Sequence, residues 1–202
     1  MPPLIQKDGG DVQEDADVPA PAGDLWVFGY GSLMWSPGFP YSEMAKARLF
    51  GWHRAFCMGS IHYRGTREDP GLVLGLAPGG SCLGRVFRVA KADRLSTIAY
   101  LRERELISYV YLERILPVRF ETRDAVAPAL CYVADTKHPQ FAGGLDLEAQ
   151  ARRILRCRGI SGSNADYLRQ TVASMDALGI RSSRLHRLLD CVEALAASSK
   201  NS

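Results

Sequence analysis

One glutamate in the sequence has a position suited to acid–base chemistry. The segment 93–106 has the residue types of a helix, and at about 100° per residue Glu105 falls beside Leu95 and Ile98 on the apolar side. Arg104 is expected to point the opposite way. A carboxyl group near a helix end, partly removed from water, has a raised pKa and suits proton transfer near neutral pH. The alternative is an ordinary ion pair between Glu105 and a neighbouring arginine.

A glycine-rich segment follows a short apolar run at residues 25–28. It reads Phe28-Gly29-Tyr30-Gly31-Ser32-Leu33, and its two glycines allow a sharp turn and close approach of a ligand to the backbone. Successive N–H groups in such a turn can converge on an anion. The dinucleotide pattern GxGxxG fails because Met34 occupies the third glycine position, and no Gly-Lys-Ser/Thr follows. A purely structural turn remains the alternative.

A polar loop at residues 59–71 carries several groups that can bind a ligand. Ser60, His62 and Arg64 lie within it, and the guanidinium of Arg64 can bind a carboxylate through two parallel hydrogen bonds. An ordinary solvated loop is an equally simple interpretation. No serine lies in a GxSxG pattern, and the other histidines lack the spacing of metal ligands, so neither a serine nucleophile nor a metal is expected.

Composition and charge exclude several classes of protein. The 202 residues are 47% hydrophobic and 23% charged, which suits one globular domain. Residues 1–23 hold one base and five acids, leaving 24 of the 25 bases and 17 of the 22 acids for residues 24–202. That surplus favours an anionic substrate, but the bases are spread along the chain, so we expect no nucleic-acid partner.

The two ends and the cysteines fix the expected organisation. Residues 1–23 are predicted to be a disordered acidic tail without the basic start and apolar stretch of a signal peptide, and residues 24–198 a single domain. No window is apolar enough to span a membrane. Five widely spaced cysteines without a CxxC pattern predict free thiols and a cytoplasmic location.

Periodicity predicts an α+β fold. Strand-like runs occur at 25–28, 47–58, 72–76, 83–90, 109–120 and 129–134. Pro78-Gly79-Gly80 is typical of a hairpin turn, and Gly51 of a bulge. Helical spacing occurs at 147–155, from a capping residue at Ser163 to Gly179, and at 185–195. Strands first and helices last indicate a mainly antiparallel or mixed sheet with flanking helices, closed as a small β-barrel.

Taken in order, these motifs resemble the ChaC-type γ-glutamylcyclotransferases. The resemblance runs from about Leu25 to Leu189 and rests on five elements. They are Val27 to Trp35 with its YGSL core, Phe39-Pro40-Tyr41, the loop Gly59 to Gly65 followed by Pro70-Gly71, Tyr100-Leu101 with Arg104-Glu105, and Ser161-Gly162-Ser163-Asn164 with Tyr167-Leu168. YGSL alone is moderately specific, whereas the ordered set is strongly specific.

The resemblance implies a function and a set of site residues. The family releases 5-oxoproline from γ-glutamyl compounds, and ChaC-type members usually act on glutathione, without a cofactor. The catalytic glutamate falls on Glu105. The expected substrate-binding residues are Val27, Phe28, Gly29, Tyr30, Gly31, Ser32, Leu33, Ser60, Arg64, Tyr109 and Tyr111.

This chain departs from the family pattern after Glu105. The family often has glycine before a tyrosine there, whereas this chain reads Leu106-Ile107-Ser108-Tyr109-Val110-Tyr111, and either tyrosine can be the matching phenol. Glu113 also stands where a proline is common. Other γ-glutamyl amines or amino acids as substrates, and a binding module without turnover, remain alternatives. A monomer and a homodimer are both compatible with the sequence.

Overall fold

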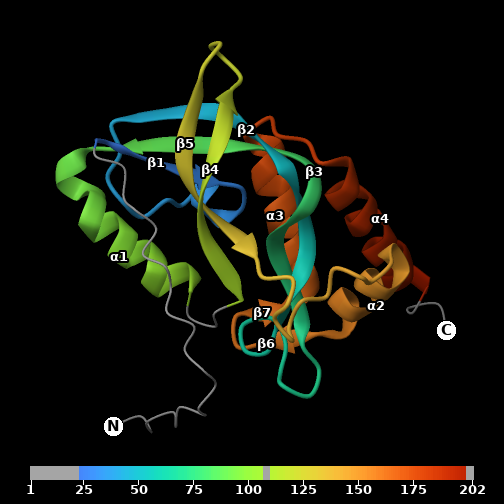
Figure 1. Ribbon diagram of the computed structural model, residues 1–202. Helices are drawn as coiled ribbons and strands as arrows, with labels where there is room; N and C mark the ends of the chain where they lie inside the picture. The colour runs from blue at the N-terminus through green and yellow to red at the C-terminus, as the bar shows by residue number, and fades with distance from the viewer. Residues whose placement is uncertain (1–22, 107–109, 199–202) are drawn as a thin grey trace, which may run out of the picture.

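The computed structural model describes residues 23–106 and 110–198, so nearly all of the predicted tail lies outside the described residues. Five strands form a closed barrel in the order β1-β3-β2-β4-β5, in which β1 and β5 run parallel and the other neighbours antiparallel (Figure 1). They are β1 Leu25–Gly29, β2 Glu43–Ser60, β3 Gly71–Val89, β4 Tyr111–Phe120 and β5 Val126–Ala134. The predicted α+β fold with a small mixed barrel is confirmed.

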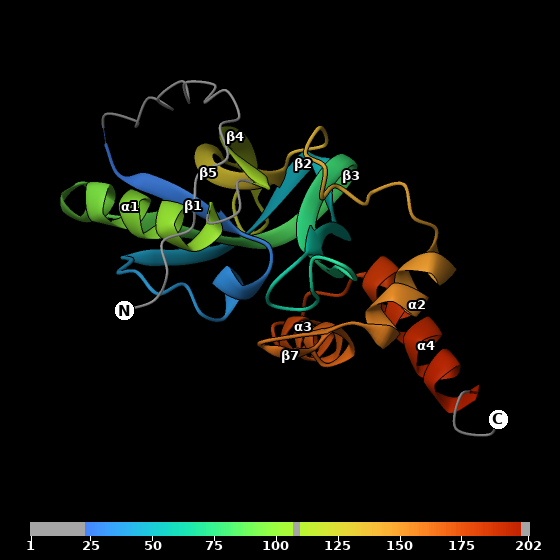
Figure 2. The ribbon, with the colours of Figure 1, turned by 90° about the horizontal axis from the view of Figure 1, so that it is seen from below.

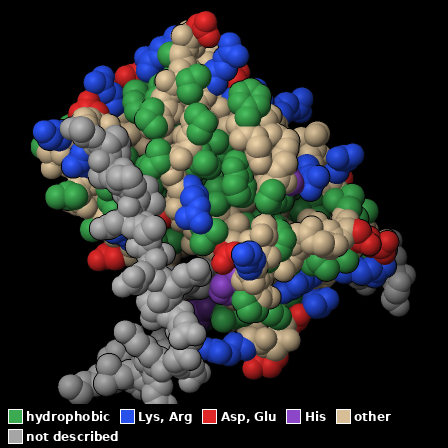
Figure 3. Space-filling model, in the orientation of Figure 1, with side chains coloured by type: hydrophobic (Ala, Val, Ile, Leu, Met, Phe, Trp, Pro, Cys, Tyr) green, Lys and Arg blue, Asp and Glu red, His purple; other side chains and the backbone are tan. Residues whose placement is uncertain are grey.

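The helices lie on two sides of this barrel. Helix α1, Arg94–Glu105, is separated from α2, Leu147–Arg156, α3, Asn164–Ala177, and α4, Ser183–Ser198, which pack against one another (Figure 2). Short elements complete the chain: the 3-10 helices η1, Ser32–Met34, and η2, Lys91–Asp93, and the paired strands β6, Arg158–Gly159, and β7, Gly162–Ser163. Lys and Arg side chains are scattered over the face shown in Figure 3.

The predicted hairpin at Pro78-Gly79-Gly80 is wrong. Strand β3 continues through it, paired with β2 along almost its whole length. Phe50 pairs with Ser81 and Trp52 with Pro78, so Gly51 lies opposite Gly79 and Gly80, and all three glycines have positive φ. The glycines therefore form a bulge, as predicted for Gly51, and the long β2–β3 ribbon bends there from the barrel toward α3 (Figure 1).

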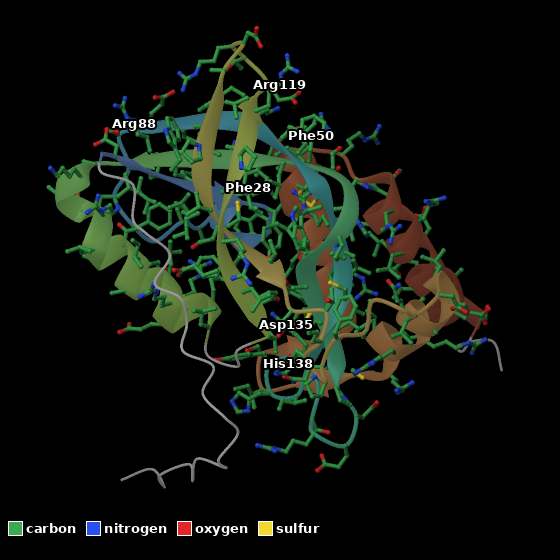
Figure 4. All side chains as sticks on the ribbon, viewed as in Figure 1. Phe28, Phe50, Arg88, Arg119, Asp135 and His138 are labelled. Atoms are coloured by element: carbon green, nitrogen blue, oxygen red, sulfur yellow. The ribbon has the colours of Figure 1, made fainter. Side chains whose placement is uncertain are left out.

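Alternation along β1 connects the two halves of the core. Phe28 points into the barrel (Figure 4) and belongs to the main cluster, which also includes α2, α3 and α4 side chains. Val27 faces the other way and shares a second cluster with Leu101 of α1. The glycine-rich segment begins where β1 ends, so its position is fixed by both clusters.

The buried face of α1 differs from the predicted one. Thr97 and Leu101 are buried and Leu95 is 72% exposed, whereas Ile98 and Leu106 pack partly buried against the second cluster, so the predicted face was wrong in part. The contact of Leu101 with the barrel wall decides the helix rotation, and the isolated pattern of apolar residues does not. Glu105 follows Leu101 by four residues, and at about 100° per residue its side chain is rotated about 40° from that of Leu101. Glu105 therefore stays close to the buried side of the helix.

Candidate active site

Glu105 is the last residue of α1, and its side chain is 18% exposed. Burial raises the pKa of Glu105 above the ordinary glutamate value, and the neighbouring Arg104 acts in the opposite direction. The sequence-predicted position, near a helix end and largely removed from water, is therefore where the structure places this carboxyl group. Such a carboxyl group can accept and return a proton near neutral pH.

The helical projection predicted that Arg104 points away from Glu105, and this prediction is wrong. Its Nε lies 3.2 Å from Oε1 of Glu105. Its Nη1 donates to the hydroxyl of Tyr100 at 2.9 Å and to the carbonyl of Ser36 at 2.8 Å, and its Nη2 donates to Oγ of Ser32 at 2.9 Å. The rotation of α1 brings Arg104 to the glycine-rich segment, so this one guanidinium connects the helix end, the carboxylate and the segment.

Two cavities meet at Glu105. The smaller has a volume of about 80 Å³, room for several water molecules, and the larger about 480 Å³. The smaller is lined by Tyr30, Gly31, Ser32, Leu33, Leu74, Glu105, Tyr111, Tyr132 and Tyr167. The larger is lined by Gly59, Ser60, Ile61, His62, Tyr63, Arg67, Val73, Arg104, Glu105, Val110, Tyr111 and Gln140. Because Glu105 and Tyr111 line both, a molecule that extends from one cavity into the other passes this carboxylate.

A buried arginine fixes the glycine-rich segment. Arg54 of β2 is 5% exposed; its Nε donates to the carbonyl of Tyr30 at 2.5 Å and its Nη2 to the carbonyl of Leu83 at 2.8 Å. Burial lowers the pKa of Arg54, and no carboxylate of the described residues forms an ion pair with it. The carbonyl of Tyr30 and the N–H of Gly31 belong to one peptide unit, so hydrogen bonding to the cation strengthens that N–H as a donor.

The amides next to this segment suit an anion. The first hydrogen bond within η1 runs from the amide of Met34 to the carbonyl of Gly31, at 2.9 Å. The N–H groups before Met34 consequently have no acceptor within that helix. They adjoin the smaller cavity, whose lining includes Gly31, Ser32 and Leu33. These groups can bind a carboxylate or a developing oxyanion.

Tyrosines form the rest of the smaller cavity. Burial raises the pKa of Tyr30 and Tyr111 well above the ordinary tyrosine value and also raises that of Tyr167, so all three phenols are neutral hydrogen-bonding groups at pH 7. The hydroxyl of Tyr111 donates to the carbonyl of Leu74 at 2.7 Å. Of the two candidate tyrosines, Tyr111 lines the site, whereas Tyr109 lies outside the described residues.

The described residues contain no cluster of three or more His, Cys, Asp or Glu side chains arranged to hold a metal ion. Within the same part of the chain, no helix is long and apolar enough to cross a membrane. The polar groups of the two linings include one carboxylate, two arginines, backbone amides and phenols, a set suited to binding a charged organic molecule and moving protons.

A family model described as ChaC-like protein matches residues 25–195. This chain belongs to the ChaC-like family. It is 33% identical over 175 residues to the glutathione-specific gamma-glutamylcyclotransferase of Escherichia coli K12, covering 87% of this chain and 75% of that protein. It is 36% identical over 172 residues to the human glutathione-specific gamma-glutamylcyclotransferase 1, covering 81% of this chain and 77% of the relative.

The fold of this ChaC-like chain is also found in a solved structure. A yeast gamma-glutamyl cyclotransferase specific to glutathione superimposes with a TM-score of 0.75, at 22% identity, and the match covers 85% of this chain and 99% of that one. At that identity the likeness bears on the fold. The barrel with its flanking helices is therefore not a peculiarity of this sequence.

Not every predicted binding residue of the ChaC-like chain lines a cavity. Val27 and Phe28 are fully buried core side chains and, with Gly29, line neither cavity, because they belong to β1 itself. Ser60 lines the larger cavity, and its Oγ accepts a hydrogen bond from the amide of Arg64 at 3.0 Å. Val27 and Phe28 therefore belong to the core, whereas Ser60 contributes to a cavity wall.

Arg64 is placed differently from its predicted role. Its guanidinium donates to the carbonyl of Ser161 and lies 4.9 Å from the ring centre of Tyr167, and Arg64 lines neither cavity. Its donors are directed to the backbone before α3, so in this structure it joins the polar loop to the C-terminal helices. Carboxylate binding by Arg64 stays a prediction without support from this geometry.

Sequence reasoning missed several residues of the site region, and three of them belong to the smaller cavity or hold the glycine-rich segment. Tyr132 and Tyr167 line the smaller cavity, and Arg54 holds the glycine-rich segment. Tyr167 had a signal, since it belongs to the SGSNADYL motif, but its side chain was not connected to the site. Arg54 had no distinguishing signal, because Arg48 and His53 lie in the same strand-like run 47–58. Tyr132 had none that distinguishes it from a core residue.

Proposed function

We propose that this chain is a glutathione-specific γ-glutamylcyclotransferase, which converts glutathione to 5-oxoproline and cysteinylglycine. The observation that carries the proposal is the position of Glu105 where two cavities meet, within a chain whose relatives bear that name. The smaller cavity, adjoining the backbone amides, suits the γ-glutamyl end of the substrate. The larger cavity has room for the part that leaves.

The reaction is an intramolecular acyl transfer. The substrate's α-amino nitrogen attacks its own γ-carbonyl carbon, the new C–N bond closes a five-membered lactam, and the bond to the cysteine nitrogen breaks. The reacting groups belong to one molecule, so the protein mainly holds it in a folded conformation. The amides between Gly29 and Leu33 stabilise the negative charge that develops on the γ-carbonyl oxygen.

Glu105 moves the protons in this scheme. Its carboxylate takes a proton from the α-ammonium group, which frees the nitrogen lone pair for attack, and returns a proton to the departing cysteine nitrogen. The neutral phenols of Tyr30 and Tyr111 beside it supply hydrogen bonds without competing for the proton. Arg104 holds the carboxylate and the helix end against Ser32.

The test is turnover of glutathione by the purified protein and its Glu105→Gln variant. This change keeps the shape and removes the base, so we expect release of 5-oxoproline to fall about 10²- to 10⁴-fold. Glu103→Gln is the matched control, because Glu103 is exposed on the same helix, and its effect should be small. A Glu105→Gln variant that works at the parent rate would refute the assignment.

The same assay decides between the alternatives. Turnover of γ-glutamyl-alanine or γ-glutamyl-lysine in preference to glutathione identifies a cyclotransferase with another substrate, and tight binding of glutathione without product identifies a binding module. We also propose a cytoplasmic location, supported by five free thiols, which cell fractionation tests. Light scattering of the purified chain distinguishes a monomer from a homodimer.

A further inference from the structure

The larger cavity has a lining that the chemistry at Glu105 does not use. Ile61, Val73 and Val110 give it apolar walls, and Arg67 and His62 also belong to its lining. If the γ-glutamyl end occupies the smaller cavity, the leaving dipeptide extends from Glu105 into this space. That dipeptide carries a thiol side chain and ends in a carboxylate.

The two arginines of this lining differ in the hydrogen bonds and ion pairs that they already form within the protein. Arg104 donates to the hydroxyl and carbonyl groups described above and contacts Glu105. Arg67 is exposed, and among the described residues it forms no ion pair within 4.0 Å. Its neighbour Glu68 feels its charge without pairing with it. Glu105 is the one carboxylate in the lining, so the lining as a whole favours an anion.

The turn that carries Arg67 is anchored on both sides. The amide of Thr66 donates to the carbonyl of Asp69 at 3.1 Å, and the carboxylate of Asp69 lies 2.7 Å from Nη2 of Arg156 on α2. Gly65 permits the tight approach, because a Cβ there would meet the backbone of Gly71 and Asp69. The backbone of the turn is thus fixed beside the cavity, and the Arg67 side chain extends from a defined position.

We propose that Arg67 binds the C-terminal carboxylate of the leaving dipeptide and so selects γ-glutamyl peptides over γ-glutamyl amines, an inference that rests on the proposed function. A guanidinium binds a carboxylate through two parallel hydrogen bonds, and the apolar walls accept the cysteine side chain beside it. Arg67 is then a specificity-determining residue, distinct from the groups that act on the bond that breaks.

The test compares glutathione with its glycine ethyl ester, which lacks the negative charge. For the parent protein, kcat/KM should be higher with glutathione. Arg67→Gln should lower kcat/KM for glutathione about tenfold, mainly through KM, and leave the value for the ester unchanged. Arg67→Lys keeps the charge but not the two parallel bonds. Its kcat/KM for glutathione should therefore lie between the values of the parent and of Arg67→Gln.

Arg119→Gln is the matched control, because Arg119 lies at the tip of the β4–β5 hairpin (Figure 4) and its side chain is 60% exposed. Its kinetics should equal those of the parent with both substrates. The proposal is overturned if Arg67→Gln leaves glutathione kinetics unchanged or lowers both substrates equally. Absence of 5-oxoproline from the parent protein with either substrate would instead overturn the proposed function, and this inference with it.

Discussion

Asn164 supports the first part of β3, along an edge to which none of the described strands pairs. It is the first residue of α3 and is fully buried, and its side chain pairs with both backbone groups of Leu72. Oδ1 accepts from the amide of Leu72 at 2.6 Å, and Nδ2 donates to its carbonyl at 2.7 Å. Strand β3 pairs with β1 only at residues 85–89, so the amide side chain replaces a strand partner at the start of β3.

The cost of removing this side chain follows from those two bonds. Asn164→Ala leaves a buried N–H and a buried C=O without partners, at about 1–3 kcal/mol each, so we expect a loss of about 2–6 kcal/mol in the free energy of unfolding. At about 2–4 °C per kcal/mol for a chain of this size, Tm should fall by about 4–24 °C. At temperatures below the Tm of the variant, its activity should also be lower than that of the parent, because Leu74, two residues further along β3, lines the smaller cavity.

Asn164→Asp keeps the size of the side chain and changes its ability to donate a hydrogen bond, so it separates these two contributions to stability. Burial raises the pKa of the introduced carboxyl group above its unfolded value, and only the protonated form can donate to the carbonyl of Leu72. Its stabilising contribution is therefore present at low pH and lost as pH rises through the folded pKa. We expect the Tm difference from the parent to widen with increasing pH.

Thermal unfolding followed by circular dichroism measures both variants. Gln150→Ala is the control, because Nε2 of Gln150 makes a single hydrogen bond, to the carbonyl of Leu145 at 2.7 Å, from a partly buried position. Its Tm should change by no more than a few degrees. An Asn164→Ala protein that melts within about 1 °C of the parent would show that this bidentate contact contributes little, and the reasoning would fail.

Two further results are expected. Because burial raises the pKa of Glu105 and the base acts when ionised, activity should rise with pH about a midpoint above the ordinary pKa of glutamate. Arg104→Gln removes the cation that lowers the pKa of Glu105, so the midpoint of the pH–rate profile should move upward. An unchanged midpoint would contradict the ion pair between Arg104 and Glu105. Gly38→Ala places a methyl group against the Tyr100 hydroxyl at positive φ and should lower Tm more than Gly51→Ala, whose φ is similar but whose surroundings are open. Equal melting temperatures would refute that contact.

Local patterns predicted the elements of the fold better than their rotation and connection. The short apolar run of β1 and the Ser163 cap are short-range features, and both are confirmed. The Gly79-Gly80 pair marks positive φ, which a hairpin turn and a bulge both require. The choice between them is made by Gly51 on the neighbouring strand, and that pairing is not visible in a local window.

The site was predictable to the extent that its chemistry lies in contiguous residues. Glu105 and the segment Tyr30 to Leu33 line one cavity, and their catalytic and binding roles stay predictions. The rotation of α1 was not, because it depends on how Leu101 meets the barrel, and Arg104 was therefore misplaced. Arg54 and Arg67 contribute through contacts and cavities formed by distant parts of the chain, and no spacing rule identifies them.

The hydrogen bond from Arg54 to Tyr30 has a consequence for cooperativity. The segment that follows β1 takes its shape from a side chain of β2, and β2 is joined to β1 by way of β3, which pairs with both strands. The segment therefore cannot keep its shape in a partly opened barrel, and local unfolding of any of these three strands removes it. The amide of Met34, which donates to the carbonyl of Gly31, should therefore resist hydrogen exchange as long as the barrel stays closed, unlike an amide of an autonomous surface loop.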